Sequence, residues 1–352
     1  MEEKKKTARE IIEGYDGPPV RIMEVCGTHT HEIFRLGIRK LLPEQVELIS
    51  GPGCPVCVTQ VGFIDEAIYL ALERQVTICT FGDLVRVPGT NMSLAGARER
   101  GAKIRIVYSP VDAKEYAKEH PKEQVTFLSV GFETTTPSAC LSVKKAREEG
   151  LTNYSILTAN KTMPQAYEAL KESADIFLYP GHVNAITGTK LCEELAKEGV
   201  SGVVAGFTAK ELLTALAVAL ARFQEGRPFF VNCYPRVVTE NGSPQAQKLV
   251  EEMMEPCDSE WRGLGVIKGS GMRLQEEWSA FDARKKYKIP SIQGKANPAC
   301  RCGDVLQGKC KPSDCKVFGK VCTPQHPIGA CMVSGEGACS AYYMYGEAEK
   351  MK

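Results

Sequence analysis

Residues 20–25 have the sequence VRIMEV, a mostly apolar run that is typical of a buried β-strand. Helical character follows at residues 32–42 and stops at Pro43, and a second strand is predicted at residues 46–50. The sequence GPG at residues 51–53 then breaks the chain. This strand–helix–strand stretch predicts an α/β protein.

The same alternation continues to about residue 240. Further strands are expected at 76–81, 103–108, 125–130, 154–158 and 176–179. Helices are expected at 59–73, 138–149 and 191–198. Repeated β–α units predict mostly parallel sheets that are covered by helices.

Four charged helical stretches each end in a glycine, which is the favoured left-handed residue just beyond a helix. These are Gly101, Gly150, Gly199 and Gly226. We therefore predict two α/β units, at residues 20–121 and 122–235, with a boundary near Pro121.

Beyond Pro235 the pattern changes. A helix is expected at residues 245–254. The glycine-rich segments at 263–265 and 269–271 are expected to be irregular.

Cysteine is the most unusual feature of the composition. The chain has 15 cysteines, and seven of them lie between residues 300 and 339. Pro, Gly and Cys dominate from residue 289 onward, and so long a loop-rich stretch needs a staple to be ordered. We predict a third, cysteine-rich unit at residues 236–352, to which residues 1–19 can also belong.

Composition narrows the function classes. The chain has 352 residues and a net charge of +1, from 44 basic and 43 acidic side chains, so neither nucleic acid nor a membrane surface is expected as a partner. No apolar stretch follows the N-terminal sequence MEEKKK, so no secretory signal is predicted. The most apolar run, residues 212–221, is about half a membrane span. We expect a cytoplasmic protein, in which clustered cysteines are typical of metal, iron–sulfur or thiol redox sites.

The first candidate motif is CGTHTHE at residues 26–32, between a predicted strand and a helix. Ligands of parallel α/β sheets bind beyond the carboxyl ends of the strands, where Cys26 and the two histidines are expected. The helix N-terminus is expected to favour the thiolate of Cys26. The alternative is a helix cap made by Thr28 or Thr30, with the histidines facing solvent.

The second motif is GPGCPVCVT at residues 51–59, which contains a C-x-x-C pair at a strand-to-helix turn. Cys54 and Cys57 are candidates for a reversible disulfide, because the helix end and the neighbouring thiol are expected to lower one pKa. They are also candidates for half of a zinc site. The alternative is a turn with two buried small side chains.

The third motif is the C-terminal cysteine set, whose spacing matches neither ferredoxins nor zinc ribbons. It comprises Cys300, Cys302, Cys310, Cys315, Cys322, Cys331 and Cys339. Four of these thiols could hold a [4Fe–4S] cluster and leave two for a disulfide. A structural zinc site is the alternative.

Three polar loops follow predicted strands, at residues 81–90, 131–137 and 179–184. Each is a candidate binding loop or a simple turn and helix cap. No Walker A motif is present and no G-x-G-x-x-G follows a strand, so a nucleotide-dependent reaction is not supported. The isolated cysteines are expected to be packing residues, namely Cys79, Cys140, Cys192, Cys233 and Cys257.

Taken together, the motifs resemble those of the HypD family of hydrogenase maturation factors. The matching pieces are CGTHTH at 26–31, GPGCPVC at 51–57, GFETTTP at 131–137, CRCG at 300–303 and CMVSGEGAC at 331–339. They occur in order over residues 20–343, which makes the resemblance far more specific than a lone C-x-x-C.

The resemblance implies a cytoplasmic metallocentre assembly factor rather than a conventional turnover enzyme. Members help to build the Fe(CN)2CO unit of [NiFe]-hydrogenases, in a complex with HypC. They receive cyanide from HypE, alone or as a HypE–HypF complex, and the unit passes through HypC to the hydrogenase large subunit. By motif, Cys26 would bind the iron under construction, and His29 would position ligands or move protons. Cys54 and Cys57 would be the redox-active pair near the same site.

The C-terminal set also resembles that of ferredoxin:thioredoxin reductase, where four cysteines hold a cluster beside a disulfide. That resemblance implies a [4Fe–4S] cluster on Cys300, Cys315, Cys322 and Cys339. It implies an adjacent disulfide between Cys302 and Cys331, whereas Cys310 does not fit the family pattern. Two other interpretations compete: an iron–sulfur thiol–disulfide oxidoreductase that acts on other proteins, and a zinc-stapled binding protein.

Overall fold

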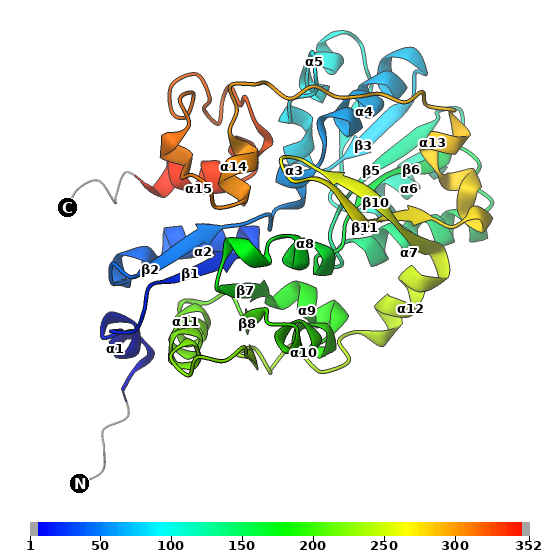
Figure 1. Ribbon diagram of the computed structural model, residues 1–352. Helices are drawn as coiled ribbons and strands as arrows, with labels where there is room; N and C mark the ends of the chain where they lie inside the picture. The colour runs from blue at the N-terminus through cyan, green and yellow to red at the C-terminus, as the bar shows by residue number, and fades with distance from the viewer. Residues whose placement is uncertain (1–5, 347–352) are drawn as a thin grey trace.

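The computed structural model describes residues 6–346, in which two parallel sheets lie beside an antiparallel hairpin (Figure 1). The expected α/β architecture with mostly parallel sheets is confirmed. Residues 1–5 of the N-terminal segment and residues 347–352 of the predicted third unit lie outside the described residues.

The first sheet has five parallel strands in the order β2-β1-β7-β8-β9. The strands are β1 (Val20–Glu24), β2 (Val46–Ser50), β7 (Ile176–Pro180), β8 (Ser201–Ala205) and β9 (Phe230–Asn232). Its helices are α1 (Ala8–Glu13), α2 (Gly27–Arg35), α8 (Pro164–Ala169), α9 (Gly181–Thr187), α10 (Lys190–Lys197) and α11 (Ala209–Phe223). Short 3-10 turns lie at Ile38–Leu41 and Lys171–Ser173.

The second sheet has four parallel strands in the order β4-β3-β5-β6. The strands are β3 (Thr77–Thr80), β4 (Ile104–Ile106), β5 (Val125–Gly131) and β6 (Tyr154–Asn160). β5 and β6 are buried along their whole length, as in parallel strands covered on both faces. The helices of this unit are α3 (Pro55–Val58), α4 (Val61–Glu73), α5 (Leu94–Glu99), α6 (Pro110–Glu119) and α7 (Thr136–Glu148), with a 3-10 turn at Gly82–Arg86.

The chain passes between the two sheets twice. It leaves the first sheet after β2, completes the second sheet, and returns to the first with β7. The first sheet is therefore assembled from two separate parts of the chain. The boundary expected near Pro121 falls between α6 and β5, inside the second sheet, because strand pairing joins segments that are distant in sequence.

A β-hairpin follows the two sheets. Its strands are β10 (Met254–Trp261) and β11 (Gly265–Leu274), which pair antiparallel. The expectation of irregular structure is therefore wrong for residues 269–271, which lie in β11, whereas residues 263 and 264 form the turn of the hairpin. Gly263 and Gly265 have φ of 81° and 78°, so these glycines make the turn rather than end a loop. The helix predicted just before the hairpin is α12 (Pro244–Met253).

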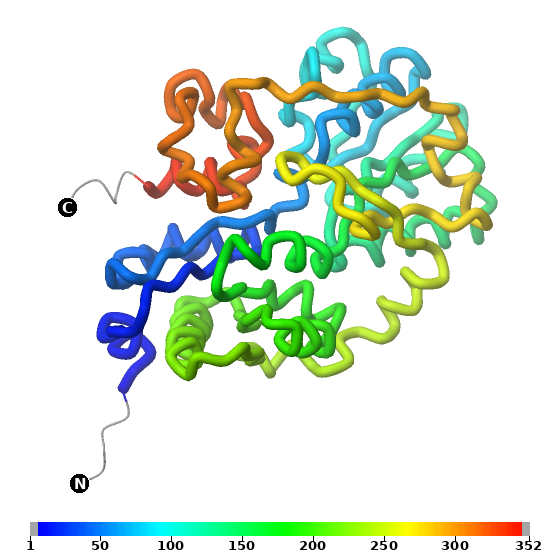
Figure 2. Tube along the Cα trace, viewed as in Figure 1, coloured from blue at the N-terminus to red at the C-terminus, as the bar shows by residue number. Residues whose placement is uncertain are grey.

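The cysteine-rich segment turns back and packs against the first sheet. After α13 (Ala283–Lys286) the chain runs back across α4, where the backbone of Gly294 lies against that of Gly62 (Figure 2). The segment then forms α14 (Cys302–Leu306) and α15 (Ala338–Tyr345), and α15 packs on α2. Short 3-10 turns lie at Glu276–Phe281, Pro312–Asp314 and Ala330–Met332.

Helix ends follow the local sequence rules. The four glycines predicted to end helices have positive φ, between 68° and 97°, as expected. The helix expected at residues 32–42 differs, because α2 starts at Gly27 and ends at Arg35. Gly37, with φ of 67°, separates it from the following turn. The CGTHTH motif therefore opens the helix, as expected, with Cys26 as its N-cap.

The apolar run at residues 212–221 lies in α11, which packs on β8 and α1. Within the described part of the chain, no helix is long and apolar enough to cross a membrane.

Candidate functional site

Two glycines bring the first two motifs into backbone contact. Cys26 follows β1 and is the N-cap of α2, and the Gly27 amide donates to the Gly53 carbonyl at 3.0 Å. A Cβ on Gly53 would lie 2.1 Å from the Cys26 nitrogen, closer than any side chain can approach. Only glycine therefore fits at Gly53, and it places Cys54 next to Cys26.

Cys26 lies in a closed environment beside a histidine that sequence analysis did not assign to the site. The thiol is 1% exposed, and its Sγ is 3.9 Å from His182 Nε2. Burial raises the pKa of Cys26 to about 12, although the backbone amides of Thr28 and His29 act in the opposite direction. The expected thiolate is therefore wrong for the free protein, and a metal would have to displace the proton.

His29 is held as a neutral imidazole. Its Nε2 donates to the Gly206 carbonyl at 3.0 Å, which leaves Nδ1 as an unprotonated, buried atom without a partner. Burial lowers the pKa of His29 to about 3. The ring of Phe207 packs against His29 and His182, at centroid distances of 4.9 Å and 5.1 Å. His182 lies in the loop at residues 179–184, one of the three polar loops predicted to follow strands.

The C-terminal segment covers this part of the first sheet. Thr28 donates to the Glu336 carboxylate at 2.6 Å, and His31 Nδ1 lies 3.1 Å from the Gly335 carbonyl. A Cβ on Gly27 would meet the Glu336 side chain at 2.6 Å. Two of the polar side chains of CGTHTH thus bind the C-terminal segment.

Cys54 and Cys57 occupy the turn into α3 and are both buried. The Cys57 amide donates to Cys54 Sγ at 3.3 Å, so Cys54 caps the helix. Burial, together with thiol hydrogen bonds to Cys331 and Cys54, raises the pKa of Cys57. The pKa reduction expected from the helix end is therefore not seen at Cys57.

Cys331 is the centre of the C-terminal sulfur atoms. It is fully buried, and interactions with the thiols of Cys302, Cys339 and Cys57 lower its pKa. Cys300 and Cys302 have their Sγ atoms 3.0 Å apart. A continuous path of sulfur contacts therefore runs from Cys54 to the C-terminal set.

The remaining C-terminal cysteines differ in how close they lie to this path. Cys322 belongs to the same buried cluster and accepts from the Ile328 amide at 3.4 Å. Cys315 faces the Ala299 carbonyl at 3.8 Å, one residue from Cys300. All 15 cysteines are free thiols.

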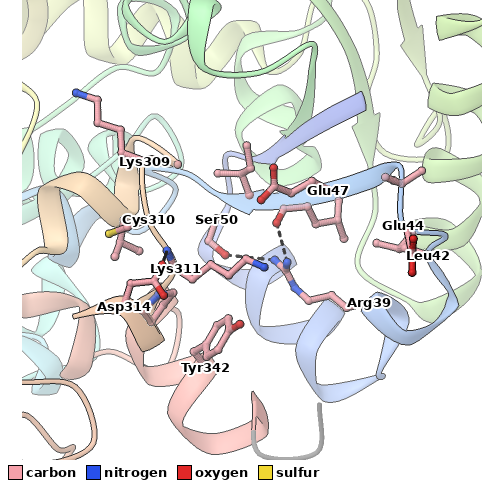
Figure 3. A pocket seen from close by; sticks show the side chains of 16 residues that line it. Arg39, Leu42, Glu44, Glu47, Ser50, Lys309, Cys310, Lys311, Asp314 and Tyr342 are labelled. Carbon is pink, nitrogen blue, oxygen red and sulfur yellow. Dashed lines mark hydrogen bonds between the residues drawn. The ribbon is translucent and has the colours of Figure 1, made fainter. Parts of the chain in front are cut away.

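Cys310 stands apart, in a cavity of about 620 Å³ between β2 and the C-terminal segment. Arg39, Lys309 and Lys311 line this cavity together with Glu47 and Asp314 (Figure 3). Apart from Cys310, none of the predicted site residues lines it, so the cavity is separate from the sulfur path.

Thiolate sulfur is the donor that iron–sulfur clusters use, and the four proposed cluster ligands converge on one region. Cys302, Cys322, Cys331 and Cys339 belong to one buried cluster, Cys300 packs against it, and Cys315 contacts Ala299, the residue before Cys300. These residues suit a cluster in donor type and location. Within residues 6–346, no three His, Cys, Asp or Glu side chains are arranged to hold a single metal ion.

A buried carboxyl and a buried phenol were missed as individual site residues. Glu133 Oε1 accepts from the Met163 amide at 2.8 Å, whereas its Oε2 and the Tyr167 hydroxyl are buried without partners. Burial raises the pKa of Glu133 to about 7, and the charges of Glu133 and Cys26 both act on Tyr167. Glu133 lies in the GFETTTP loop, which the sequence indicated by its position after a strand and by its match to a family motif, without singling out Glu133.

The fold and the site define an α/β protein in which buried thiols from three motifs converge between two parallel sheets. A family model described as "Hydrogenase formation hypA family", HypD, matches residues 2–346. The hydrogenase maturation factor HypD of Rhizobium leguminosarum bv. viciae is 44% identical, over 97% of this chain and 92% of its own. The HypD of Escherichia coli K12 is 43% identical, over 94% of this chain and 90% of its own. The HypD of Cupriavidus necator is 42% identical, over 95% of this chain and 92% of its own. The chain belongs to the HypD family of hydrogenase maturation factors.

Proposed function

We propose that this maturation factor is the scaffold and redox partner on which the Fe(CN)2CO unit of a [NiFe]-hydrogenase is assembled. It acts with HypC, takes cyanide from HypE or a HypE–HypF complex, and delivers the unit to the hydrogenase large subunit through HypC. The iron is substrate here, and Cys26 is its protein thiolate. Low-spin iron that carries cyanide and carbon monoxide suits a soft thiolate ligand.

The observation that carries the proposal is the sulfur path from Cys54 and Cys57 through Cys331 to Cys302. Release of cyanide from a thiocyanate-like donor consumes two electrons and one proton and leaves a thiol. Two dithiol pairs in contact can supply those electrons by exchange.

The exchange can be written for the residues of this chain. The Cys331 thiolate attacks a Cys54–Cys57 disulfide at Cys57, so that a Cys57–Cys331 bond forms and Cys54 leaves as a thiolate. Cys302 then attacks Cys331, which releases Cys57 and forms the Cys302–Cys331 disulfide. The C-terminal pair is oxidised by two electrons, and the C-x-x-C pair is reduced by two. Cys331 suits the role of the attacking thiol because it interacts with the thiols of both Cys57 and Cys302.

Cys300, Cys315, Cys322 and Cys339 would hold a [4Fe–4S] cluster, which supplies single electrons when bound. The surrounding chain keeps water from these thiols, since most of them are buried. A role as an oxidoreductase for other proteins fits less well, because Cys54 and Cys57 are 3% and 0% exposed. A foreign thiol could not reach either sulfur without local opening.

The test is the content of iron, zinc and acid-labile sulfide in anaerobically purified protein, with Mössbauer spectra. About four irons and four sulfides per chain are expected for a [4Fe–4S] cluster, and Cys300→Ala should lose them. In the complex with HypC, additional low-spin iron should be lost in Cys26→Ala. Cys233→Ala, at an isolated cysteine, is the matched control and should keep both.

Stoichiometric zinc without sulfide would contradict the relay and favour a zinc-stapled scaffold. Dithiol activity on generic protein substrates, without HypC, would favour the oxidoreductase instead.

A further inference from the structure

The tip of the β10–β11 hairpin lies between the two groups of thiols. The Arg262 amide donates to the Val58 carbonyl, and Arg262 Nε donates to the Thr59 carbonyl, both at 2.8 Å. On the other side, a Cβ on Gly263 would lie 2.2 Å from Gly303 Cα. The hairpin tip therefore contacts the end of α3, which carries Cys57, and the start of α14, which carries Cys302 (Figure 1).

Arg262 holds an unpaired charge at this position. The residue is 9% exposed, and its Nη2 is buried without a hydrogen-bond partner. In the part of the chain that the structure describes, no carboxylate forms an ion pair with Arg262, whereas the neighbouring Arg301 pairs with Asp304 at 2.9 Å. A buried, unpaired guanidinium is costly, so its retention points to an anion that it faces.

Among the described residues that line the cavity beside Arg262, the anion-forming groups without an ion pair are sulfur atoms. Arg262 lines a cavity of about 290 Å³ together with Cys300 and Cys302. Asp304, the acidic side chain of this cavity, already forms an ion pair with Arg301.

We infer that Arg262 is a positioning residue for the C-terminal sulfur set, and that its guanidinium, in the cavity that Cys300 and Cys302 line, makes the group held there easier to reduce. This inference rests on the proposed function, because it assigns Arg262 to the proposed [4Fe–4S] site. Reduction adds one negative charge to that group, and a nearby guanidinium in a poorly solvated site stabilises the added charge. Removal of the guanidinium should therefore make reduction harder.

The experiment is an anaerobic redox titration of the full-length protein, followed by visible absorbance and electron paramagnetic resonance. At the wild-type midpoint, we expect the ratio of reduced to oxidised cluster to fall about tenfold in Arg262→Gln, which is ~59 mV for a one-electron couple. Arg262→Lys, which keeps the charge, should restore most of the ratio. Arg273→Gln is the matched control, because Arg273 lies on the same hairpin but pairs with Glu255 at the other end.

An unchanged ratio in Arg262→Gln would overturn the inference, as would an equal fall in Arg262→Lys and Arg262→Gln. If Arg262→Gln loses iron and sulfide, the redox titration of Arg262→Lys tests the inference instead. A wild-type ratio of reduced to oxidised cluster in Arg262→Lys supports the role of the charge. Loss of the cluster in Arg262→Lys as well overturns the inference.

Wild-type protein without iron and sulfide would contradict the proposed cofactor but not the role of Arg262. The same variants are then compared in a glutathione titration of the Cys302–Cys331 pair, analysed by mass spectrometry. Arg262→Gln should shift this pair about tenfold toward the disulfide, and no shift would overturn the inference.

Discussion

Glu133 carries a carboxyl whose Oε2 is buried without a partner, close to the sulfur site. Because burial raises the pKa of Glu133 from 4.5 to about 7, the folded protein binds more protons here than the unfolded chain between those values. Unfolding free energy must then decrease as pH rises through this range. The stabilising contribution is present below pH 4.5 and is lost as pH rises through 7.

Glu133→Gln keeps the shape of the side chain but cannot ionise. We expect the variant to gain stability relative to wild type as pH rises from 5 to 8, by about 1–3 kcal/mol. Urea unfolding at both pH values measures this difference. Glu47→Gln, at a half-exposed carboxylate, is the control for replacing a carboxyl by an amide. Equal differences for Glu133→Gln at pH 5 and 8 would show that this carboxyl is not protonated in the folded protein.

At the scale of elements, the β10–β11 hairpin joins the second sheet to the thiol site. Trp261 is 0% exposed, stacks on Phe132 at 5.8 Å between centroids, and donates Nε1–H to Ser270 at 2.8 Å. The hairpin therefore does more than close a loop, since its buried tryptophan immediately precedes Arg262.

Trp261→Ala should lower the free energy of unfolding by about 3–5 kcal/mol, the range for large buried aromatics. It should also expose Cys57 to alkylation, which mass spectrometry can locate. Trp278, the second of the two tryptophans, is only partly buried, so Trp278→Ala should cost less and leave Cys57 protected. Equal costs for the two variants, or a protected Cys57 in Trp261→Ala, would mean that the hairpin does not hold α3 in place.

The local sequence pattern was sufficient to predict those strands whose own residues indicate that they are buried. The strands at 46–50 and 125–130 were predicted almost to the residue, because both are rich in apolar and β-branched residues. The hairpin was missed because only Met254 and Trp261 of β10 are buried, and the polar residues between them resemble a loop. A strand pair of this kind is stabilised by pairing rather than by composition.

The candidate site was predictable in its thiols but not in their surroundings. Cysteines in short motifs are recognisable as candidate site residues from the sequence alone, and Cys26, Cys54 and Cys57 do lie together. His182 and Arg262 lie near these thiols because segments that are far apart in the chain pack together. No local sequence pattern predicts such contacts. Their roles follow from burial and missing partners, which only the folded chain defines.

At the scale of the whole molecule, the two sheets differ in how the chain builds them. The four-stranded sheet uses only residues 77–160, whereas the five-stranded sheet needs strands on both sides of that range. A fragment of residues 20–121 holds two strands from each sheet and completes neither. A fragment of residues 61–160 holds the whole second sheet and the helices between its strands.

We therefore expect the fragment of residues 61–160 to show native-like far-UV circular dichroism and a cooperative urea transition. The fragment of residues 20–121 should show neither, because β1 lacks β7 and β3 lacks β5. When the fragments of residues 1–60 and 161–352 are added to the fragment of residues 61–160, protection of the β1 amides in hydrogen exchange should be restored. A cooperative transition in the 20–121 fragment would mean that sequence-local units fold before the sheets are completed.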